Sequence, residues 1–123
     1  MTIQNRLDLF VASSMIERED AQKIQTICLI YTKEFGLDVE IEASERFITH
    51  FAGMYMRMKE KQVIEPISSF VMEQLITDPY FQNANVLLGR LVKEVSIPSE
   101  EMGYFLLHLI HFLGQQNECQ STC

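Results

Sequence analysis

Residues 97–114, IPSEEMGYFLLHLIHFLG, decide the fold of this chain. The apolar run follows Ser99, which can cap a helix, and Glu100 and Glu101 then fall in the first turn, where negative charge is favourable. A helix formed here is apolar on nearly every side, so we expect it to run through the middle of a helical bundle or across a subunit interface. Gly114 is the residue at which we expect it to end.

The rest of the chain has the same helical period, and no Asn-Gly or Asp-Gly dipeptide signals a hairpin. The sequence therefore predicts an all-α protein: a compact five-helix bundle with an extra short N-terminal helix. We assign residues 1–16 to an N-terminal helical extension, 17–115 to the bundle and 116–123 to a polar C-terminal tail. The first expected helix covers residues 2–13, and the second starts with a capping box at Ser14 and Glu17 and ends at Gly36. A third helix carries Phe47 to Met58, and a fourth begins at Pro66. A fifth is capped by Asp78, with Pro79 in its first turn.

Composition excludes several classes of function. The 123 residues carry 17 acidic and 10 basic side chains, for a net charge of −7, which argues against direct binding of nucleic acid. Arg6 and Asp8 interrupt any signal-peptide core, and no apolar run approaches the length of a membrane span. We expect a cytoplasmic protein with reduced thiols.

The three histidines are the residues that call for a chemical explanation. His108 and His111 stand one helical turn apart in the apolar run, and burying an imidazole there costs free energy unless its nitrogens are satisfied. His50 lies on the apolar face of its own helix, and Arg57, seven residues later, returns to the same face. A satisfied core residue is the commonest explanation for such a histidine, and we adopt it for His111.

Three functional explanations compete with this structural one. A metal site needs more ligands than the two neighbouring histidines supply, and nothing positions Cys119 and Cys123, so we expect no metal or cofactor. No nucleophile elbow, glycine-rich phosphate loop or carboxylate pair in apolar surroundings is present, so we do not expect an enzyme. The third possibility is that histidine is itself the substrate, accepting a phosphoryl group whose charge must recruit a cation such as Arg57 or separate packed surfaces.

Two motifs carry a resemblance to a known family. EMGYFLLH, residues 101–108, resembles the second histidine motif of the PTS regulation domain of transcriptional antiterminators. HFAGMYMR, residues 50–57, resembles its first motif, in which Arg follows His by seven positions. The separation of the two motifs also fits, and the resemblance spans roughly residues 17–115.

The resemblance implies a cytoplasmic five-helix bundle that forms homodimers. It implies phosphorylation by the phosphocarrier protein or an enzyme II subunit of the sugar phosphotransferase system, with transcription affected through a partner protein in trans. Carried over by position, His50 and His108 are the phosphoacceptors, supported by Arg57 and Glu101. Thr49 stands where family members commonly carry Asp, which leaves open a bundle that is never phosphorylated and serves as a dimerisation or protein-interaction module; a small metal-binding protein is a third alternative.

Overall fold

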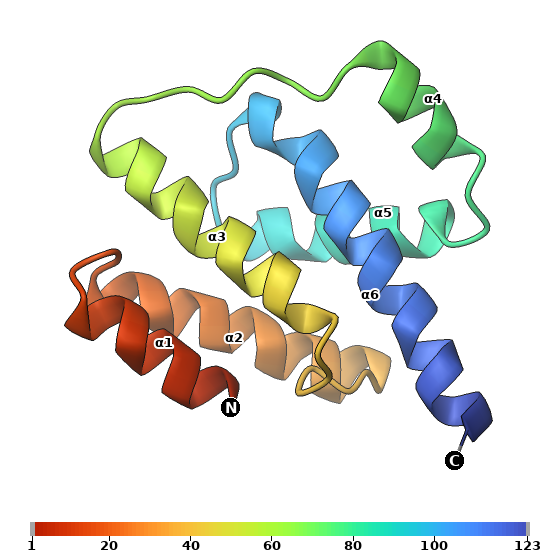
Figure 1. The fold of residues 1–123 in the computed structure, drawn as a ribbon, viewed down its shortest axis with the longest axis horizontal. Coiled ribbons are helices and arrows are strands. Elements are labelled where there is room, and N and C mark those ends of the chain that lie inside the picture. The colour runs from red at the N-terminus through yellow and green to blue at the C-terminus, as the bar shows by residue number, and fades with distance from the viewer. Residues whose placement is uncertain (1, 123) are drawn as a thin grey trace. The chain divides into compact units, whose positions relative to one another are not determined.

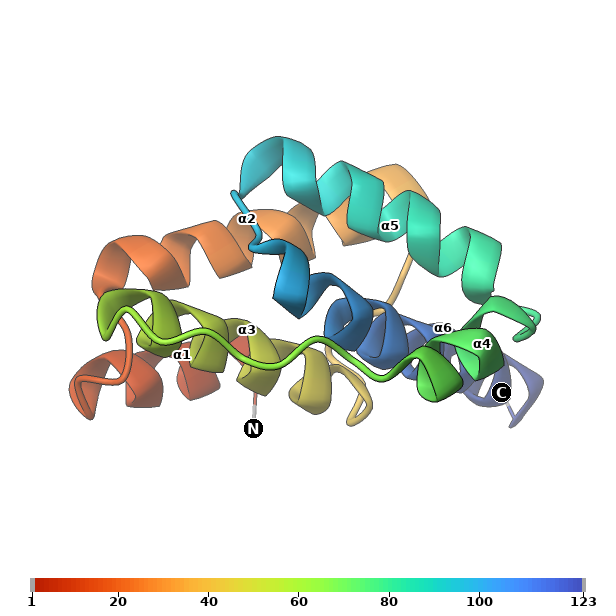
Figure 2. The same ribbon diagram turned by 90° about the horizontal axis from the view of Figure 1, so that it is seen from above.

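The structure is a computed structural model that describes residues 2–122, with side chains as far as Gln116. All regular elements in this described range are helices, which confirms the prediction of an all-α protein. The chain divides into two compact units, Met1–Val63 and Ile64–Cys123. Figures 1 and 2 show the helices of both units, and each unit is described by itself below.

The first unit consists of α1 (Ile3–Ala12), α2 (Arg18–Phe35) and α3 (Ser44–Lys59). Helix α2 packs against both α1 and α3 (Figure 1). The expected N-terminal helix is therefore an integral wall of this unit, with Leu7 fully buried and Arg6 paired to Glu45 of α3 at 2.7 Å. The core of this unit includes Ile24, Ile27 and Tyr31 of α2 and Phe47, Phe51 and Met54 of α3, whereas Met58 in the last turn of α3 is exposed.

Helix α2 starts three residues later than the capping box predicted at Ser14 would place it. Ser14 adopts a positive φ of 65° in the turn after α1, which is incompatible with a helix start. The N-cap is Glu17, whose backbone N–H donates to Asp20 Oδ2 at 3.1 Å. The predicted end is confirmed: Gly36 takes the left-handed conformation at φ 65°, which glycine adopts without a Cβ penalty.

The second unit consists of α4 (Ser69–Ile76), α5 (Phe81–Glu94), a short 3-10 turn η1 (Ser99–Glu101) and α6 (Met102–Thr122). Helix α6 packs against both α4 and α5. Its buried side chains lie on one broad face, and Leu107 on the other side is exposed, so within this unit α6 is not buried on every side as its apolar sequence suggests. No helix in the described part of the chain has the length and apolarity needed to cross a membrane. The buried residues of α6 are Phe105, Leu106, Leu109, Ile110, Phe112 and Leu113.

Helix α4 begins after the predicted start at Pro66. Pro66 lies in an extended segment that leads into the helix, visible in Figure 2. Ser68 is the N-cap, and its hydroxyl oxygen accepts from the Val71 N–H at 3.2 Å. A hydroxyl that satisfies an otherwise unbonded N–H of the first turn fixes the helix start more strongly than a proline two residues earlier.

Helix α5 also begins later than predicted. Asp78 does act at the junction, because its Oδ1 accepts from the Tyr80 N–H at 2.8 Å. That bond closes a turn over Pro79, so Pro79 lies outside the helix and Tyr80 becomes the N-cap.

Helix α6 continues past Gly114 to Thr122, so the predicted end at Gly114 is wrong. Gly36 is the only glycine with positive φ in the described range, which means that Gly114 keeps ordinary helical geometry. A glycine inside a helix costs only about 1 kcal/mol relative to alanine, and the packing of α6 offsets such a cost.

Candidate functional site

The first predicted site lies on α3. Phe47, Phe51 and Met54 are buried and fix the rotation of this helix about its axis. The rotation leaves His50 half-buried and Thr49 exposed. The Nε2 atom of His50 is enclosed, with less than 1 Å² exposed to solvent. The first histidine motif is thus placed at the margin of the core, where an imidazole is neither fully dry nor freely hydrated.

Arg57 reaches back along α3 toward His50. A Cβ atom built on Gly53 would stand 3.3 Å from Arg57 Nη1 and 3.9 Å from its Cζ, so the guanidinium lies directly over the helix backbone at residue 53. Residues 50 and 53 are separated by one turn, or about 4.5 Å along the helix axis. The spacing predicted that His50 and Arg57 share a face, and the conformation of the arginine side chain brings its positive end to within about one turn of the histidine.

The last turns of α3 are attached to the beginning of α2. Lys59 Nζ contacts Glu17 Oε1 at 2.8 Å, which lowers the pKa of the Glu17 carboxyl and raises that of the Lys59 ammonium. Tyr55 stacks on Phe51 with ring centroids 5.6 Å apart. Burial is the main reason why the pKa of Tyr55 is raised, and the carboxylates of Asp20 and Glu19 add to it. These contacts connect the segment between His50 and Lys59 to α2 and to the core of its unit.

The second predicted site lies on α6 and the turn before it. His108 and His111 are both half-buried and stand one turn apart. Glu101 is buried, with 2% of its surface exposed, and its N–H donates to the Pro98 carbonyl at 3.0 Å as the 3-10 turn leads into α6. Glu101 precedes His108 by two turns, which corresponds to about 10 Å along the helix axis. The predicted supporting carboxylate is therefore separated from the histidine and lies at the start of the helix.

An extended segment covers the helix one turn before His108. Glu65 and Ile67 belong to this segment, which precedes α4. The Tyr104 hydroxyl donates to the Glu65 carbonyl at 2.9 Å, and a Cβ on Gly103 would meet Ile67 Cγ2 at 2.3 Å. The glycine of the second motif therefore has a steric purpose, because it admits the side chain of Ile67 against the helix.

Metal ligands do not gather in the described part of the chain. Among the side chains that the structure describes, which end at Gln116, no group of three or more His, Cys, Asp or Glu could hold a metal ion. Cys28 is buried in the first unit. The side chains of Cys119 and Cys123 lie outside the described residues, so the expectation stated for them stays a prediction.

Sequence reasoning missed two features of these sites. Gly53 stands inside the first motif, yet its importance depends on an Arg57 rotamer that no spacing rule specifies. The contact of Ile67 with Gly103 joins residues 36 positions apart, and its only sequence signal is a glycine next to the bulky run from Tyr104 to Leu113.

Comparison with known proteins assigns the chain to a family. The model of the PRD domain matches residues 25–112, which is more than half of the chain and includes both histidine motifs. The chain belongs to the PRD domain family, whose members are regulatory domains of the sugar phosphotransferase system. It is also 26% identical over 119 residues to the uncharacterized protein YhfY of Escherichia coli (strain K12), a similarity that covers 94% of this chain and 98% of that protein. No solved structure matches.

Proposed function

We propose that this PRD domain is a phosphorylation-responsive regulatory module rather than an enzyme. His50 and His108 accept phosphoryl groups from the phosphocarrier protein or an enzyme II subunit in the cytoplasm. The domain forms a homodimer whose geometry depends on phosphorylation, and it affects transcription or antitermination through a protein partner in trans. It needs no cofactor and makes no contact with nucleic acid or membrane.

The single observation that carries this proposal is the position of the Arg57 guanidinium on Gly53, one turn from His50. Arginine binds phosphate oxygens through charge-assisted hydrogen bonds and is the side chain best suited to a planar, multidentate contact. A cation held against the helix at this point supports the acceptor role of His50, because the product of the transfer is an anion.

The transfer requires no cofactor. The P–N bond of a phosphohistidine on the donor breaks as a P–N bond to the neutral imidazole forms, and the imidazole loses its N–H proton to solvent or to the departing donor histidine. The imidazole pKa near neutrality keeps the nucleophile available at cellular pH. Because Nε2 of His50 is enclosed, transfer to that atom requires the ring to move or its neighbours to separate.

The added charge supplies the regulatory effect. A phosphoryl group brings about −1.5 to −2 charges, and enclosing such a charge without a partner costs several kcal/mol. At a half-buried histidine the group must therefore engage a cation or open the packed surface. Either response changes the surface that a partner or a second copy meets.

The test is incubation of the full chain with phosphoenolpyruvate, enzyme I, the phosphocarrier protein and candidate enzyme II subunits, followed by intact mass measurement. We expect acid-labile phosphorylation that falls in His50→Ala and in His108→Ala and disappears in the double variant. His111→Ala is the matched control, because His111 is half-buried on the same helix as His108 and should leave phosphorylation unchanged. Phosphorylation that survives the double substitution would refute the site assignment, and a monomer in both states would refute the dimer.

A second candidate function is a dimerisation or protein-interaction module that is never phosphorylated. The observation that favours it is Thr49, an exposed neutral residue where a carboxylate would orient or activate the imidazole of His50. This alternative predicts that no donor transfers a phosphoryl group although the protein still associates. A restored response in Thr49→Asp would identify the missing carboxylate as the reason.

A further inference from the structure

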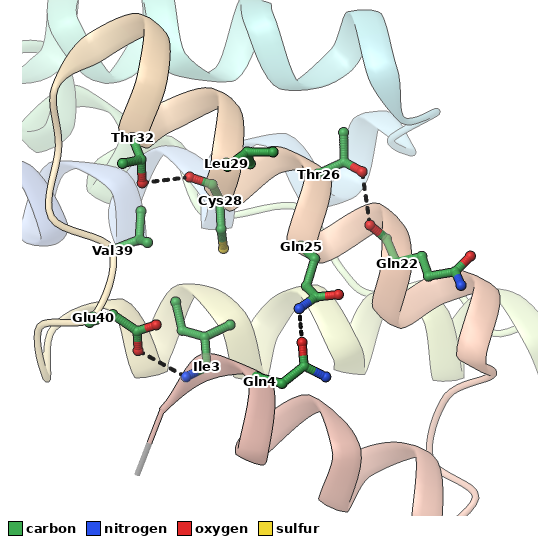
Figure 3. A pocket seen from close by; sticks show the side chains of 10 residues that line it. All are labelled: Ile3, Gln4, Gln22, Gln25, Thr26, Cys28, Leu29, Thr32, Val39 and Glu40. Carbon is green, nitrogen blue, oxygen red and sulfur yellow. Dashed lines mark hydrogen bonds between the residues drawn. The ribbon is translucent and has the colours of Figure 1, made fainter.

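A cavity of about 520 Å³ opens on the first unit, away from both histidine motifs. Its walls are the start of α1, one side of α2 and the segment just before α3 (Figure 3). Its volume lies within the range of small-molecule sites, about 300–1,000 Å³. The family match begins at residue 25, so the α1 wall with Ile3 and Gln4 precedes the matched region. The cavity is thus a feature of this chain that the regulatory motifs do not explain.

One part of the lining is apolar. Ile3 and Cys28 are buried and form the floor, and Val39 is half-buried beside them. Figure 3 shows the Cys28 sulfur, Ile3 and Val39 around the same space. Burial raises the pKa of the Cys28 thiol to about 12, so at neutral pH this floor is uncharged. An aliphatic chain would replace water on this surface favourably.

The polar part of the lining is rich in acceptors. The Thr26 hydroxyl donates to the Gln22 carbonyl and the Thr32 hydroxyl donates to the Cys28 carbonyl, each at 2.9 Å. Both hydroxyl protons are therefore committed to the helix backbone, and the oxygens present lone pairs outward. Gln25 donates one amide N–H to the side chain of Gln4, which leaves its carbonyl oxygen able to accept and its second N–H able to donate.

Glu40 is the only charged residue among those that line the cavity, all of which lie in the described part of the chain. Its Oε1 accepts from the Ile3 N–H at 2.9 Å, which holds the carboxylate at the cavity edge. No Lys, Arg or His faces the ligand space. An anion would meet a carboxylate and several acceptors without a cation to receive it, so the lining disfavours phosphates and carboxylic acids and favours a positive donor.

We propose that this cavity binds an amphipathic organic ammonium ion, with its N–H groups directed to Glu40 and neighbouring acceptor oxygens and its alkyl part over Ile3, Cys28 and Val39. An ammonium group offers three donors and no acceptor, which suits the Glu40 carboxylate and the acceptor oxygens of the lining. The proposal is independent of histidine phosphorylation, because none of the lining residues belongs to either motif.

The experiment is a protein-observed NMR titration of the isotope-labelled full chain with hexylammonium, hexanol and hexanoate, which share one alkyl chain and differ in their head group. We expect saturable binding of hexylammonium that weakens as salt is raised, weaker binding of hexanol and none of hexanoate. Shifts of the Cys28 and Val39 amide signals would locate the ligand. Absence of saturable binding, equal binding of hexanol, preference for hexanoate, or shifts confined to other residues would each overturn the proposal.

Two charge-neutralising variants complete the test. Glu40→Gln keeps an oxygen that can accept from the Ile3 N–H but removes the negative charge. It should weaken hexylammonium binding about two- to fivefold, as expected for an exposed ion pair. Glu42→Gln is the matched control, because Glu42 is an exposed acid two positions later that does not line this cavity. Equal affinity in the Glu40 variant, with both variants retaining the thermal midpoint of the parent, would refute the role of the carboxylate.

Discussion

Ile67 occupies the space that a side chain at Gly103 would need. The Cβ of any residue placed at 103 would lie 3.0 Å from Ile67 Cβ and only 2.3 Å from Ile67 Cγ2, and the second distance is closer than nonbonded carbon atoms approach. The neighbouring Tyr104 hydroxyl donates to the Glu65 carbonyl at 2.9 Å. Together these contacts fasten the extended segment before α4 to α6, one turn ahead of His108.

The first prediction concerns this contact. Gly103→Ala should lower the free energy of unfolding by about 1–3 kcal/mol, because the Ile67 side chain and its backbone must move away from α6. Ile67→Ala removes the nearest methyl group, so the cost of Gly103→Ala should shrink in the Ile67→Ala background. A double-mutant cycle in urea measures this coupling.

Gly89 provides the control for the first prediction. It lies exposed in α5, and nothing stands within 4 Å of a Cβ built there. Gly89→Ala should therefore stabilise the protein by about 0.5–1 kcal/mol through its helix propensity. Equal effects of alanine at 89 and at 103 would contradict the steric role of Gly103.

The second prediction is that a substitution at Gly53 reduces phosphorylation of His50 without lowering the stability of the protein. Gly53→Ala improves helix propensity, and the flexible Arg57 guanidinium can move away from the new Cβ, so stability should be unchanged or higher. The displaced cation should support a phosphoryl group on His50 less well, so the phosphorylated fraction at His50 should fall in a His108→Ala background. Gly89→Ala in that background should gain stability with no loss of phosphorylation.

The third prediction places a fixed negative charge at the first site. His50→Glu should lower the free energy of unfolding by about 1–3 kcal/mol, because a half-buried position must then accommodate a carboxylate. Thr49→Glu adds the same charge at the exposed neighbouring position and should change stability by less than about 0.5 kcal/mol. If Arg57 partners the new carboxylate, adding Arg57→Ala to His50→Glu will destabilise more than Arg57→Ala does alone.

The fourth prediction follows from the raised pKa of Cys28. Burial, with a smaller contribution from the Glu40 carboxylate, raises this pKa from its ordinary value of 9.0 to about 12. Above pH 9 the unfolded chain loses the thiol proton that the folded chain retains, so the unfolded state binds fewer protons and stability falls as pH rises from about 9 to about 12. The slope from this one group approaches about 1.4 kcal/mol per pH unit.

The measurement compares the parent with Cys28→Ala by urea unfolding at several pH values. The difference in unfolding free energy between the parent and Cys28→Ala should be constant below pH 9 and should narrow above it. Only the parent has the Cys28 thiol, whose deprotonation in the unfolded chain lowers stability at high pH. Iodoacetamide at pH 8 should label the Cys28 peptide only in unfolded protein. Rapid labelling of that peptide in the folded protein would contradict the burial of Cys28.

Several features of the fold follow from local sequence. The helical period predicted an all-α chain. The predicted helix end at Gly36 was confirmed, because a helix often ends at a residue in the left-handed conformation and glycine is the residue that adopts this conformation most readily. The predicted helix starts at Ser14, Pro66 and Pro79 were wrong for a common reason. At Ser14 and Pro66 the helix starts moved to the later caps Glu17 and Ser68, and the predicted cap Asp78 closes a turn over Pro79 instead of starting the helix. The hydrogen bonds that make these choices depend on the conformation of the whole turn.

The sequence by itself determined which residues could carry the chemistry, because the spacing of His50 and Arg57 fixes their common face on any helix. Only the tertiary structure decided how these side chains are placed. The Arg57 rotamer over Gly53, the enclosure of His50 Nε2 and the seating of Ile67 on Gly103 arise from packing between segments far apart in the chain. Helical periodicity is encoded by residues close together in the sequence. The packing around each side chain depends on residues that only the folded chain brings together, so the sequence pattern does not reveal it.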